Sequence, residues 1–304
     1  RSSAFGRLPT ASKMEDYKKS PHFRADRGVF VNRRQDAIDA ARKRTMTLTN
    51  TLKHLLNASP DVTPKTPLPT VTPDFEAFQQ PAEDLKAIWL GHSSILLHLE
   101  GQTVLIDPVL APRTGPLGFM MKRFQKTVAT PAELPLIDLV LITHDHYDHL
   151  DMATIKAFQH TDTHFIVPLG VSAHLMHWGI SAARIQELDW WQRTRFKELE
   201  IIATPAQHFS GRHVIKQTRS LWASWVIKTP KHRVYFSGDS GYDVHFKAIG
   251  EALGPFDLAF IESGQYSTLW PDVHLHPEES LQAFVDRWHV TGYADYREMI
   301  EIGG

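Results

Sequence analysis

The sequence predicts an α/β protein with two β-sheets flanked by helices. Short strand-like runs come first, and Glu100-Gly101 forms a hairpin turn between two of them. Further along the chain, such runs alternate with segments of helical spacing. Early strands followed by this alternation favour two sheets with helices on their outer faces. The predicted strands are 87–90, 94–99, 102–106, 136–142, 163–167, 199–204, 222–227, 233–236 and 258–261, and the predicted helices are 152–158, 172–178 and one that begins at Pro277.

The length and composition of the chain suit one large domain or two small ones. Its 304 residues, 42% of them hydrophobic, can enclose a substantial core. A net charge of −1 gives no electrostatic reason to expect a nucleic-acid partner. The absence of cysteine excludes disulfides, thiolate metal ligands and cysteine nucleophiles. No apolar run approaches the roughly 18 residues of a membrane-spanning helix.

Residues 1–84 are interpreted as an N-terminal arm, and residues 85–304 as the main domain. From 35 to 56, apolar residues recur at helical spacing among basic ones, which predicts a basic amphipathic helix. Such a helix can contact a membrane surface peripherally, although it more often packs on its own domain. The prolines between 59 and 75 favour an extended strap. The chain starts at Arg1, so a signal or anchor could precede it, and a cytoplasmic or cell-envelope location stays open.

The segment 143–151 carries the clearest chemical signal. It reads Thr-His-Asp-His-Tyr-Asp-His-Leu-Asp, and it follows the apolar run 136–142, which predicts a buried strand because it is short and β-branched. Imidazole nitrogens and carboxylate oxygens, the ligands that suit Zn²⁺ and related ions, therefore stand where a strand ends. A polar loop that merely caps a helix is the alternative, but such a cluster is far rarer than a lone histidine.

Three later residues repeat this placement at the end of a strand. His208, Asp239 and His274 each follow a predicted strand. The remaining histidines lack such a context, and we expect them to be surface or core residues: His98, His160, His164, His174, His177, His213, His232 and His245.

The motif His144-x-His146-x-Asp148-His149 resembles the signature of the metallo-β-lactamase superfamily. Residues 85–285 are similar to one branch of it, the N-acylphosphatidylethanolamine-hydrolysing phospholipase D and its bacterial relatives. The resemblance implies an αββα sandwich. A weaker similarity at 20–32 implies the leader that precedes the catalytic domain in this branch, and a poorly ordered terminus is the alternative. The matching segments are Trp89-Leu90-Gly91-His92-Ser93-Ser94, Asp107-Pro108, Leu188-Asp189-Trp190-Trp191, Pro205 to Arg212, Ser237-Gly238-Asp239-Ser240-Gly241-Tyr242 and His274-x-His276-Pro277-Glu278-Glu279. We expect Trp190 and Trp191 to line the core or the pocket wall.

The resemblance implies two metal sites that share one ligand. The implied cofactor is zinc, up to two ions per chain, with iron or manganese as alternatives. Asp148 would also orient the attacking water and accept its proton. The implied ligands are His144, His146 and His208 for the first metal and Asp148, His149 and Asp239 for the second, with Asp239 bridging both.

Three further residues are expected around these ligands. Asp107 would support the site from behind as a carboxylate that orients a ligand histidine. His92 lies at the pocket mouth or is a buried, hydrogen-bonded histidine. His274 contacts the substrate or helps the leaving group, or else it caps the helix that begins at Pro277.

One residue of the family pattern has no clear counterpart. The family carries a further histidine, in a His-Trp-Gly motif downstream of the Pro277-Glu278-Glu279 segment, which completes the shell of the second metal. This chain has no His-Trp-Gly, so its C-terminal part is atypical or incomplete. Trp288-His289 has the order reversed and comes early, which makes His289 a weaker candidate ligand. With one ligand fewer, the second metal should bind less tightly than the first.

The implied function is hydrolysis by a metal-bound hydroxide, in a phospholipase D-like phosphodiesterase. The expected partner is a small-molecule or lipid ester, with phosphodiesters first and lactones or other carboxylic esters as the alternative. A redox-active di-iron protein is less compatible, because flavin-linked di-iron members carry Glu where this chain has His146-x-Asp148. A non-catalytic metal-binding module is a further alternative, against which the intact histidine loop argues. The oligomeric state stays open.

Overall fold

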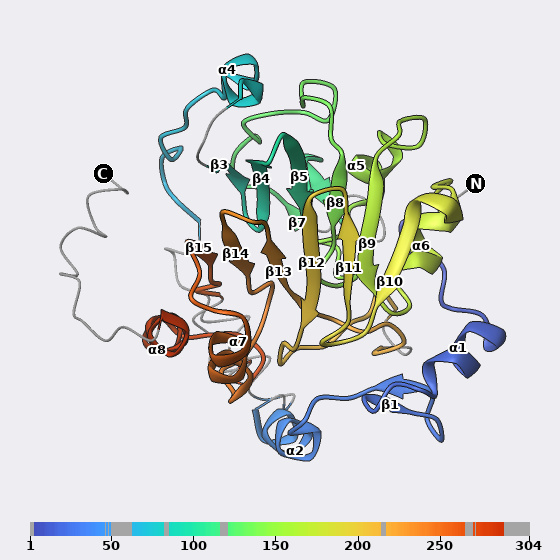
Figure 1. Ribbon diagram of the computed structural model, residues 1–304. Coiled ribbons are helices and arrows are strands. Elements are labelled where there is room, and N and C mark those ends of the chain that lie inside the picture. The colour runs from blue at the N-terminus through green and yellow to red at the C-terminus, as the bar shows by residue number, and fades with distance from the viewer. Residues whose placement is uncertain are drawn as a thin grey trace.

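Two β-sheets pack face to face in the computed structural model of the protein (Figure 1). The structure describes residues 3–45, 47, 49, 63–81, 85–115, 121–213, 217–264, 270 and 272–288. The first sheet has the strand order β10-β9-β8-β5-β4-β3, and the second has the order β11-β12-β13-β14-β15. Helices lie on the outer faces of the sheets, as the sequence predicts.

The elements have the following bounds. The first sheet contains β3 (Lys86–Gly91), β4 (Ser94–Leu99), β5 (Gln102–Ile106), β8 (Leu139–Leu141), β9 (His164–Pro168) and β10 (Ile185–Leu188). The second contains β11 (Arg193–Phe196), β12 (Leu199–Thr204), β13 (Ser224–Lys228), β14 (Arg233–Phe236) and β15 (Leu258–Phe260). The helices are α1 (Ala11–Tyr17), α2 (Gln35–Thr45), α4 (Phe75–Gln79), α5 (Met152–Lys156), α6 (Ser172–His177), α7 (His245–Leu253) and α8 (Pro277–Trp288). Two short hairpins pair β1 (Phe23–Arg24) with β2 (Val29–Phe30) and β6 (Arg113–Thr114) with β7 (Met121–Lys122).

Strand direction in the first sheet brings two loops together. The strands β3, β4 and β5 are antiparallel, and the predicted turn between the last two is confirmed, with φ of 49° at Glu100 and 70° at Gly101. The strands β5, β8 and β9 are parallel, so their carboxyl ends meet at one edge. The loops after β5 and β8 therefore lie side by side, and the Thr143 N–H donates to the Asp107 carboxylate at 2.7 Å.

Strand direction in the second sheet brings three more loops to one edge. The strand β13 is antiparallel to β12 and β14, and β14 is parallel to β15. Consequently β12, β14 and β15 run in one direction, and the loops after them leave from the same edge. These loops carry His208, Asp239 and Glu262.

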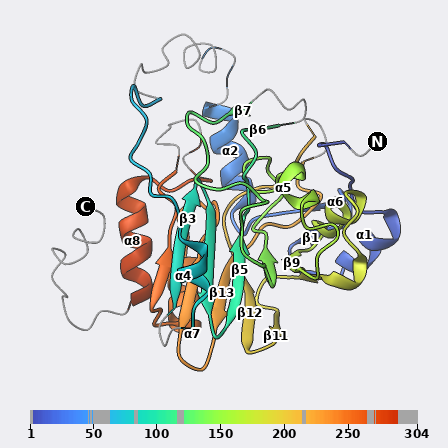
Figure 2. The same ribbon diagram turned by 90° about the horizontal axis from the view of Figure 1, so that it is seen from above.

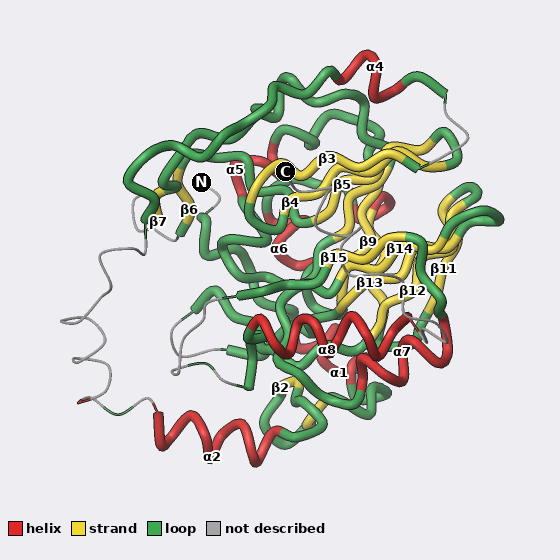
Figure 3. Tube along the Cα trace, turned by 90° about the vertical axis from the view of Figure 1, so that its left-hand side faces the viewer, coloured by secondary structure: helices red, strands yellow, loops and turns green. Residues whose placement is uncertain are grey.

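Hydrophobic clusters hold the layers together. Leu97 of β4 and Trp225 of β13 belong to the cluster between the sheets. The next residue of β4, Leu96, points to the other face and packs in a second cluster with Ile155 of α5. A third cluster joins Tyr235 of β14 to α7. In Figure 2, α8 lies on one side of the strands and α6 on the other, and Figure 3 shows α7 and α8 side by side.

The described part of the N-terminal arm packs against the main domain. Tyr17, Phe23 and Phe30 are buried and belong to the cluster between the sheets. The alternative of a poorly ordered terminus is therefore wrong for residues 3–34. The predicted basic helix is observed as α2, while most of its continuation lies outside the described residues, and the strap at 63–73 contains neither helix nor strand. Among the described helices, none has the length and apolarity to cross a bilayer.

Several sequence predictions need correction. The edge strands β10 and β11 and the helix α7 were not predicted, and in β11 the sequence Arg-Thr-Arg-Phe has no apolar run to reveal it. The strand predicted at 136–142 is limited to β8, because Leu136 is exposed and the Asp138 side chain bonds to the Thr103 N–H. Trp190 is buried, as expected, but Trp191 is 41% exposed and is not a core residue.

Candidate metal centre

Three imidazoles lie close together at the edge where loops from the two sheets meet. His144 and His146 lie on the loop after β8, and His208 lies on the loop after β12. His146 Nδ1 is 2.9 Å from His144 Nε2 and 3.2 Å from His208 Nε2. Tetrahedral zinc with bonds of about 2.0–2.1 Å separates its ligand nitrogens by roughly 3.3 Å. The spacing of these three nitrogens therefore fits a single metal ion.

A second group shares a carboxylate with the first. Asp239 Oδ1 is 3.2 Å from His149 Nε2, while Asp239 Oδ2 is 3.7 Å from His208 Nε2 and 4.0 Å from His144 Nε2. The two oxygens of one carboxylate thus face different histidines. Asp148 lies close to His149, with one possible ligand atom of each within 4.8 Å of the other. The structure brings all six implied ligands together.

His149 carries a buried nitrogen that hydrogen bonding leaves unused. Its Nδ1 donates to the buried carboxylate of Asp107 at 2.8 Å. Its Nε2 is buried and lies 3.2 Å from Asp239 Oδ1, but the geometry of this contact is not that of a hydrogen bond, and no other described residue offers one. A buried polar atom without a partner is costly, and a metal ion is one partner that would satisfy it. The donor set and this unsatisfied atom both fit a metal ion.

Each of three candidate ligand histidines is fixed through the ring nitrogen that faces away from the cluster. Thr143 Oγ1 is 2.9 Å from His144 Nδ1, and His208 Nδ1 donates to the carbonyl of Val273 at 2.8 Å. Asp107 does the same for His149, as the carboxylate behind the site was expected to do. Such bonds set the tautomer and leave the other nitrogen free to bind.

Burial keeps two of these rings neutral. Burial and the neighbouring His149 hold the pKa of His144 well below its ordinary value. Burial likewise holds the pKa of His208 well below its ordinary value, although Asp239 acts in the opposite direction. A neutral imidazole offers the lone pair that metal binding requires.

Asp148 and His92 stand at the mouth of the centre. The side chain of Asp148 is 31% exposed, and its Oδ2 is 3.5 Å from His92 Nε2. His92 is 45% exposed and packs edge-on against the ring of His149, with ring centroids 5.3 Å apart. His92 therefore occupies the mouth, and the alternative of a buried histidine is wrong.

His274 faces the shared carboxylate rather than the end of a helix. Its Nδ1 is 3.0 Å from Glu262 Oε2 and 3.9 Å from Asp239 Oδ2. The first turn of α8 is instead closed by Glu279, whose side chain accepts from the His276 N–H at 2.9 Å. The alternative role of His274 as a helix cap is therefore wrong.

Glu262 belongs to the site but was missed from the sequence. It follows β15, accepts from the Ser240 N–H and bonds to His274. Burial raises the pKa of Glu262 to about 7. The sequence offered one signal, the position of Glu262 just after a predicted strand. The same kind of position identified Asp239. The remaining candidate, His289, lies outside the described residues.

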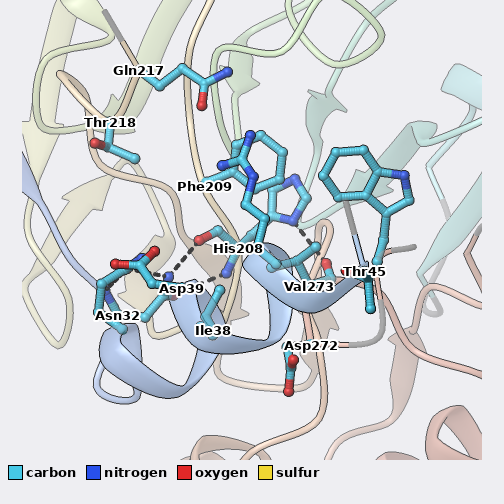
Figure 4. A pocket seen from close by; sticks show the side chains of 13 residues that line it. Asn32, Ile38, Asp39, Thr45, His208, Phe209, Gln217, Thr218, Asp272 and Val273 are labelled. Carbon is cyan, nitrogen blue, oxygen red and sulfur yellow. Dashed lines mark hydrogen bonds between the residues drawn. The ribbon is translucent and has the colours of Figure 1, made fainter. Parts of the chain in front are cut away.

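A small open cavity lies beside the cluster, between α2 and the loop of His208 (Figure 4). Phe209 forms its inner wall and packs against the rings of His146 and His208, at centroid distances of 4.6 and 4.7 Å. Trp270 stacks on Phe209 at 6.0 Å. The guanidinium of Arg42 lies 5.7 Å from the Phe209 ring. His208 itself is among the residues that line the cavity, so the cavity reaches the first group of histidines.

Comparison with known proteins places the chain in a family. Residues 102–287 match the model of a beta-lactamase superfamily domain. The chain is 44% identical over 225 residues to an uncharacterized protein of Mycobacterium tuberculosis, covering 73% of this chain and 60% of that protein. It is 37% identical over 211 residues to the N-acyl-phosphatidylethanolamine-hydrolyzing phospholipase D 1 of Caenorhabditis elegans, covering 65% of this chain and 59% of that protein.

A solved structure supports the fold. The diiron beta-hydroxylase CmlA from Streptomyces venezuelae superposes with a TM-score of 0.51 at 22% identity, covering 69% of this chain and 44% of that chain. The chain spans about three fifths of the length of the two curated relatives. The chain therefore belongs to the beta-lactamase superfamily, with the metallo-β-lactamase fold that its sequence predicts.

Proposed function

We propose that this protein is a metal-dependent hydrolase of phosphodiesters, phospholipids included. The observation that carries the proposal is the convergence of two ligand groups on one carboxylate. His144 and His208 face one oxygen of Asp239, and His149 faces the other. A carboxylate in this position can bridge two divalent ions, and the imidazole and carboxylate ligands suit zinc.

The chemistry needs no protein nucleophile. Two bound divalent ions would lower the pKa of a shared water towards about 7 and stabilise the negative charge that develops on an attacked phosphorus. The Asp148 carboxylate, partly exposed at the mouth, can orient that water and accept its proton. His274, which bonds to Glu262 beside Asp239, is placed to donate a proton to the leaving oxygen.

Two features support a lipid among the substrates. The cavity beside the histidines combines apolar side chains, among them Ile38, Phe209 and Trp270, with polar and charged ones such as Arg42, so it suits a group that is apolar in part, as an acyl chain next to a polar head would be. The name of the Caenorhabditis elegans relative states that it hydrolyses N-acyl-phosphatidylethanolamine. The basic residues Lys43 and Arg44 are exposed on α2, and we propose a peripheral contact of this helix with an anionic membrane.

A substrate panel tests the proposal. Zinc-loaded protein is assayed on a bis-aryl phosphodiester, an N-acyl phosphatidylethanolamine in mixed micelles, a lactone and a β-lactam, with the Asp148→Asn variant as the matched control. We expect the highest kcat/KM for a phosphodiester, and its loss in the control. A higher kcat/KM for the lactone would favour the carboxylic-ester alternative. Tight metal binding without turnover of any substrate would favour the binding module.

A further inference from the structure

The loop of His208 is held by a side chain from the N-terminal arm. The Asn32 Nδ2 amide donates to the carbonyl of His208 at 2.8 Å, and the N–H of His208 donates to Asn32 Oδ1 at 3.1 Å (Figure 4). The two residues are 176 positions apart in the chain. Asn32 is only 6% exposed, so water does not compete freely for these bonds. One side chain therefore satisfies both backbone groups of a candidate ligand.

These two bonds complete the restraint on His208. The residue lies beyond the end of β12, where the ladder of the sheet no longer supplies partners for the backbone. Its ring is tied through Nδ1 to the carbonyl of Val273. With backbone and ring both fixed, Nε2 is directed at His146 Nδ1, 3.2 Å away. A shift of the loop would move this nitrogen out of the cluster.

The environment of Asn32 requires an amide. Its Nδ2 faces two acceptors, the His208 carbonyl and Gln35 Oε1, the latter at 3.0 Å. Its Oδ1 faces a donor, the His208 N–H. Aspartate has no donor for the two acceptors, and leucine has neither group. The amide orientation is thus determined by its neighbours.

The arm around Asn32 is anchored on both sides. Gln35 Oε1 also accepts from the backbone N–H of Asn32 at 3.0 Å, and Gln35 Nε2 donates to Asp39 at 2.9 Å. The next residue, Arg33, forms a two-point ion pair with Asp243, one bond of which measures 2.9 Å. These contacts give Asn32 a fixed position from which it can restrain another residue.

We infer that Asn32 is a positioning residue for the first metal ion, acting through His208, so that the N-terminal arm is part of the metal centre. The inference rests on the proposed role of His208 as a ligand. Groups that orient a metal ligand from behind typically change metal affinity by about 10–100-fold when removed. Asn32 differs from such groups only in holding the ligand by its backbone.

The test uses Co²⁺ as the probe on the full chain. The affinity of the tighter site is measured by chelator competition, and the visible absorption of bound Co²⁺ reports its ligand geometry. The variants are Asn32→Leu, Asn32→Asp and the control Tyr17→Phe. Tyr17→Phe also removes a hydrogen bond between arm and body, that of the Tyr17 hydroxyl to Glu187 Oε2 at 3.1 Å, but it does not touch His208.

We expect Asn32→Leu to weaken Co²⁺ binding about 10–100-fold and to alter its spectrum. Asn32→Asp keeps the acceptor for the His208 N–H but turns an oxygen towards the His208 carbonyl, so it should also weaken Co²⁺ binding, and it carries the test alone if Asn32→Leu does not fold. Tyr17→Phe should keep the affinity and spectrum of the unmodified chain. Unchanged affinity and spectrum in folded Asn32 variants, or equal losses in the control, would overturn the inference while leaving the metal site intact. Failure of the unmodified chain to bind Co²⁺ would instead overturn the proposed function itself.

Discussion

His149 and Asp107 form a buried pair in which Nδ1 of the histidine lies 2.8 Å from the carboxylate of the aspartate. The same carboxylate accepts from the backbone N–H and the hydroxyl of Thr143, at 2.7 and 2.5 Å. Asp107 thus fixes the tautomer of His149 and the start of the histidine loop together. The parallel pairing of β5 and β8 allows Asp107 to make both contacts, because Asp107 and the histidine loop follow strands that end at the same edge of the sheet.

The first prediction concerns Asp107→Asn. One amide oxygen cannot replace both carboxylate oxygens, so the bond that sets the His149 tautomer should weaken. We expect the affinity of the second metal site to fall about 10–100-fold, with a smaller change at the first. Zinc competition titrations measure both. Asp138→Asn is the matched control, because Asp138 accepts from the Thr103 N–H at the opposite end of the same two strands. Equal losses in both variants would contradict the role of Asp107.

The second prediction concerns Asp148→Asn. The amide cannot accept a proton from water and is a weaker ligand than the carboxylate. Turnover should fall by orders of magnitude, while the first-site metal and the fold are kept, because the first group consists of His144, His146 and His208. Steady-state kinetics with metal analysis of the same sample check this. Turnover like that of the unmodified protein would show that another residue handles the proton.

The third prediction separates the two metal affinities. The first position is surrounded by three buried or partly buried imidazoles, whereas the second has His149, Asp148 and the shared Asp239, with the imidazole of His92 only at the exposed mouth. We expect a tight first ion and a labile second one in this 304-residue chain. A titration against a competing chelator should give two well-separated affinities. Two equally tight sites would indicate a further ligand, for which His289 is the candidate.

The sequence predicted those elements and site residues whose signal lies in neighbouring positions of the chain. Strand β4 was predicted because Ile95, Leu96 and Leu97 are consecutive apolar residues, and the strand is buried on both faces. Strand β11 was not, because an edge strand that alternates arginine with partly buried residues has no such run. The histidine loop was identified because its candidate ligands are neighbours in the chain.

The parts of the site that were missed depend on contacts between distant segments. Glu262 is a single glutamate after a strand, and only the parallel pairing of β14 and β15 brings it beside Asp239. Asn32 lies in the N-terminal arm, and no pattern in the sequence specifies which residues of the main domain the arm contacts. Spacing and motifs can identify side chains capable of binding a metal, but they do not reveal what holds those side chains in place.

The last prediction concerns the close approach of the two central loops. Gly238, just before Asp239, has a φ of 56°, and a Cβ at this position would lie 2.8 Å from the Cβ of Thr143. Gly238→Ala should therefore cost about 1 kcal/mol for the left-handed backbone and about 1–3 kcal/mol more for the clash. Gly101→Ala is the matched control, because Gly101 has a φ of 70° with no atom within 4 Å of the added Cβ.

Urea unfolding of the metal-free protein measures both costs. We expect Gly101→Ala to lose about 1 kcal/mol and Gly238→Ala clearly more. In Gly238→Ala, the displaced Thr143 should also disturb Asp107, which accepts from it, and so weaken the second metal site. If the two alanine variants were equally stable and bound zinc equally well, the loops would not be in the tight contact that joins the two sheets at the metal centre.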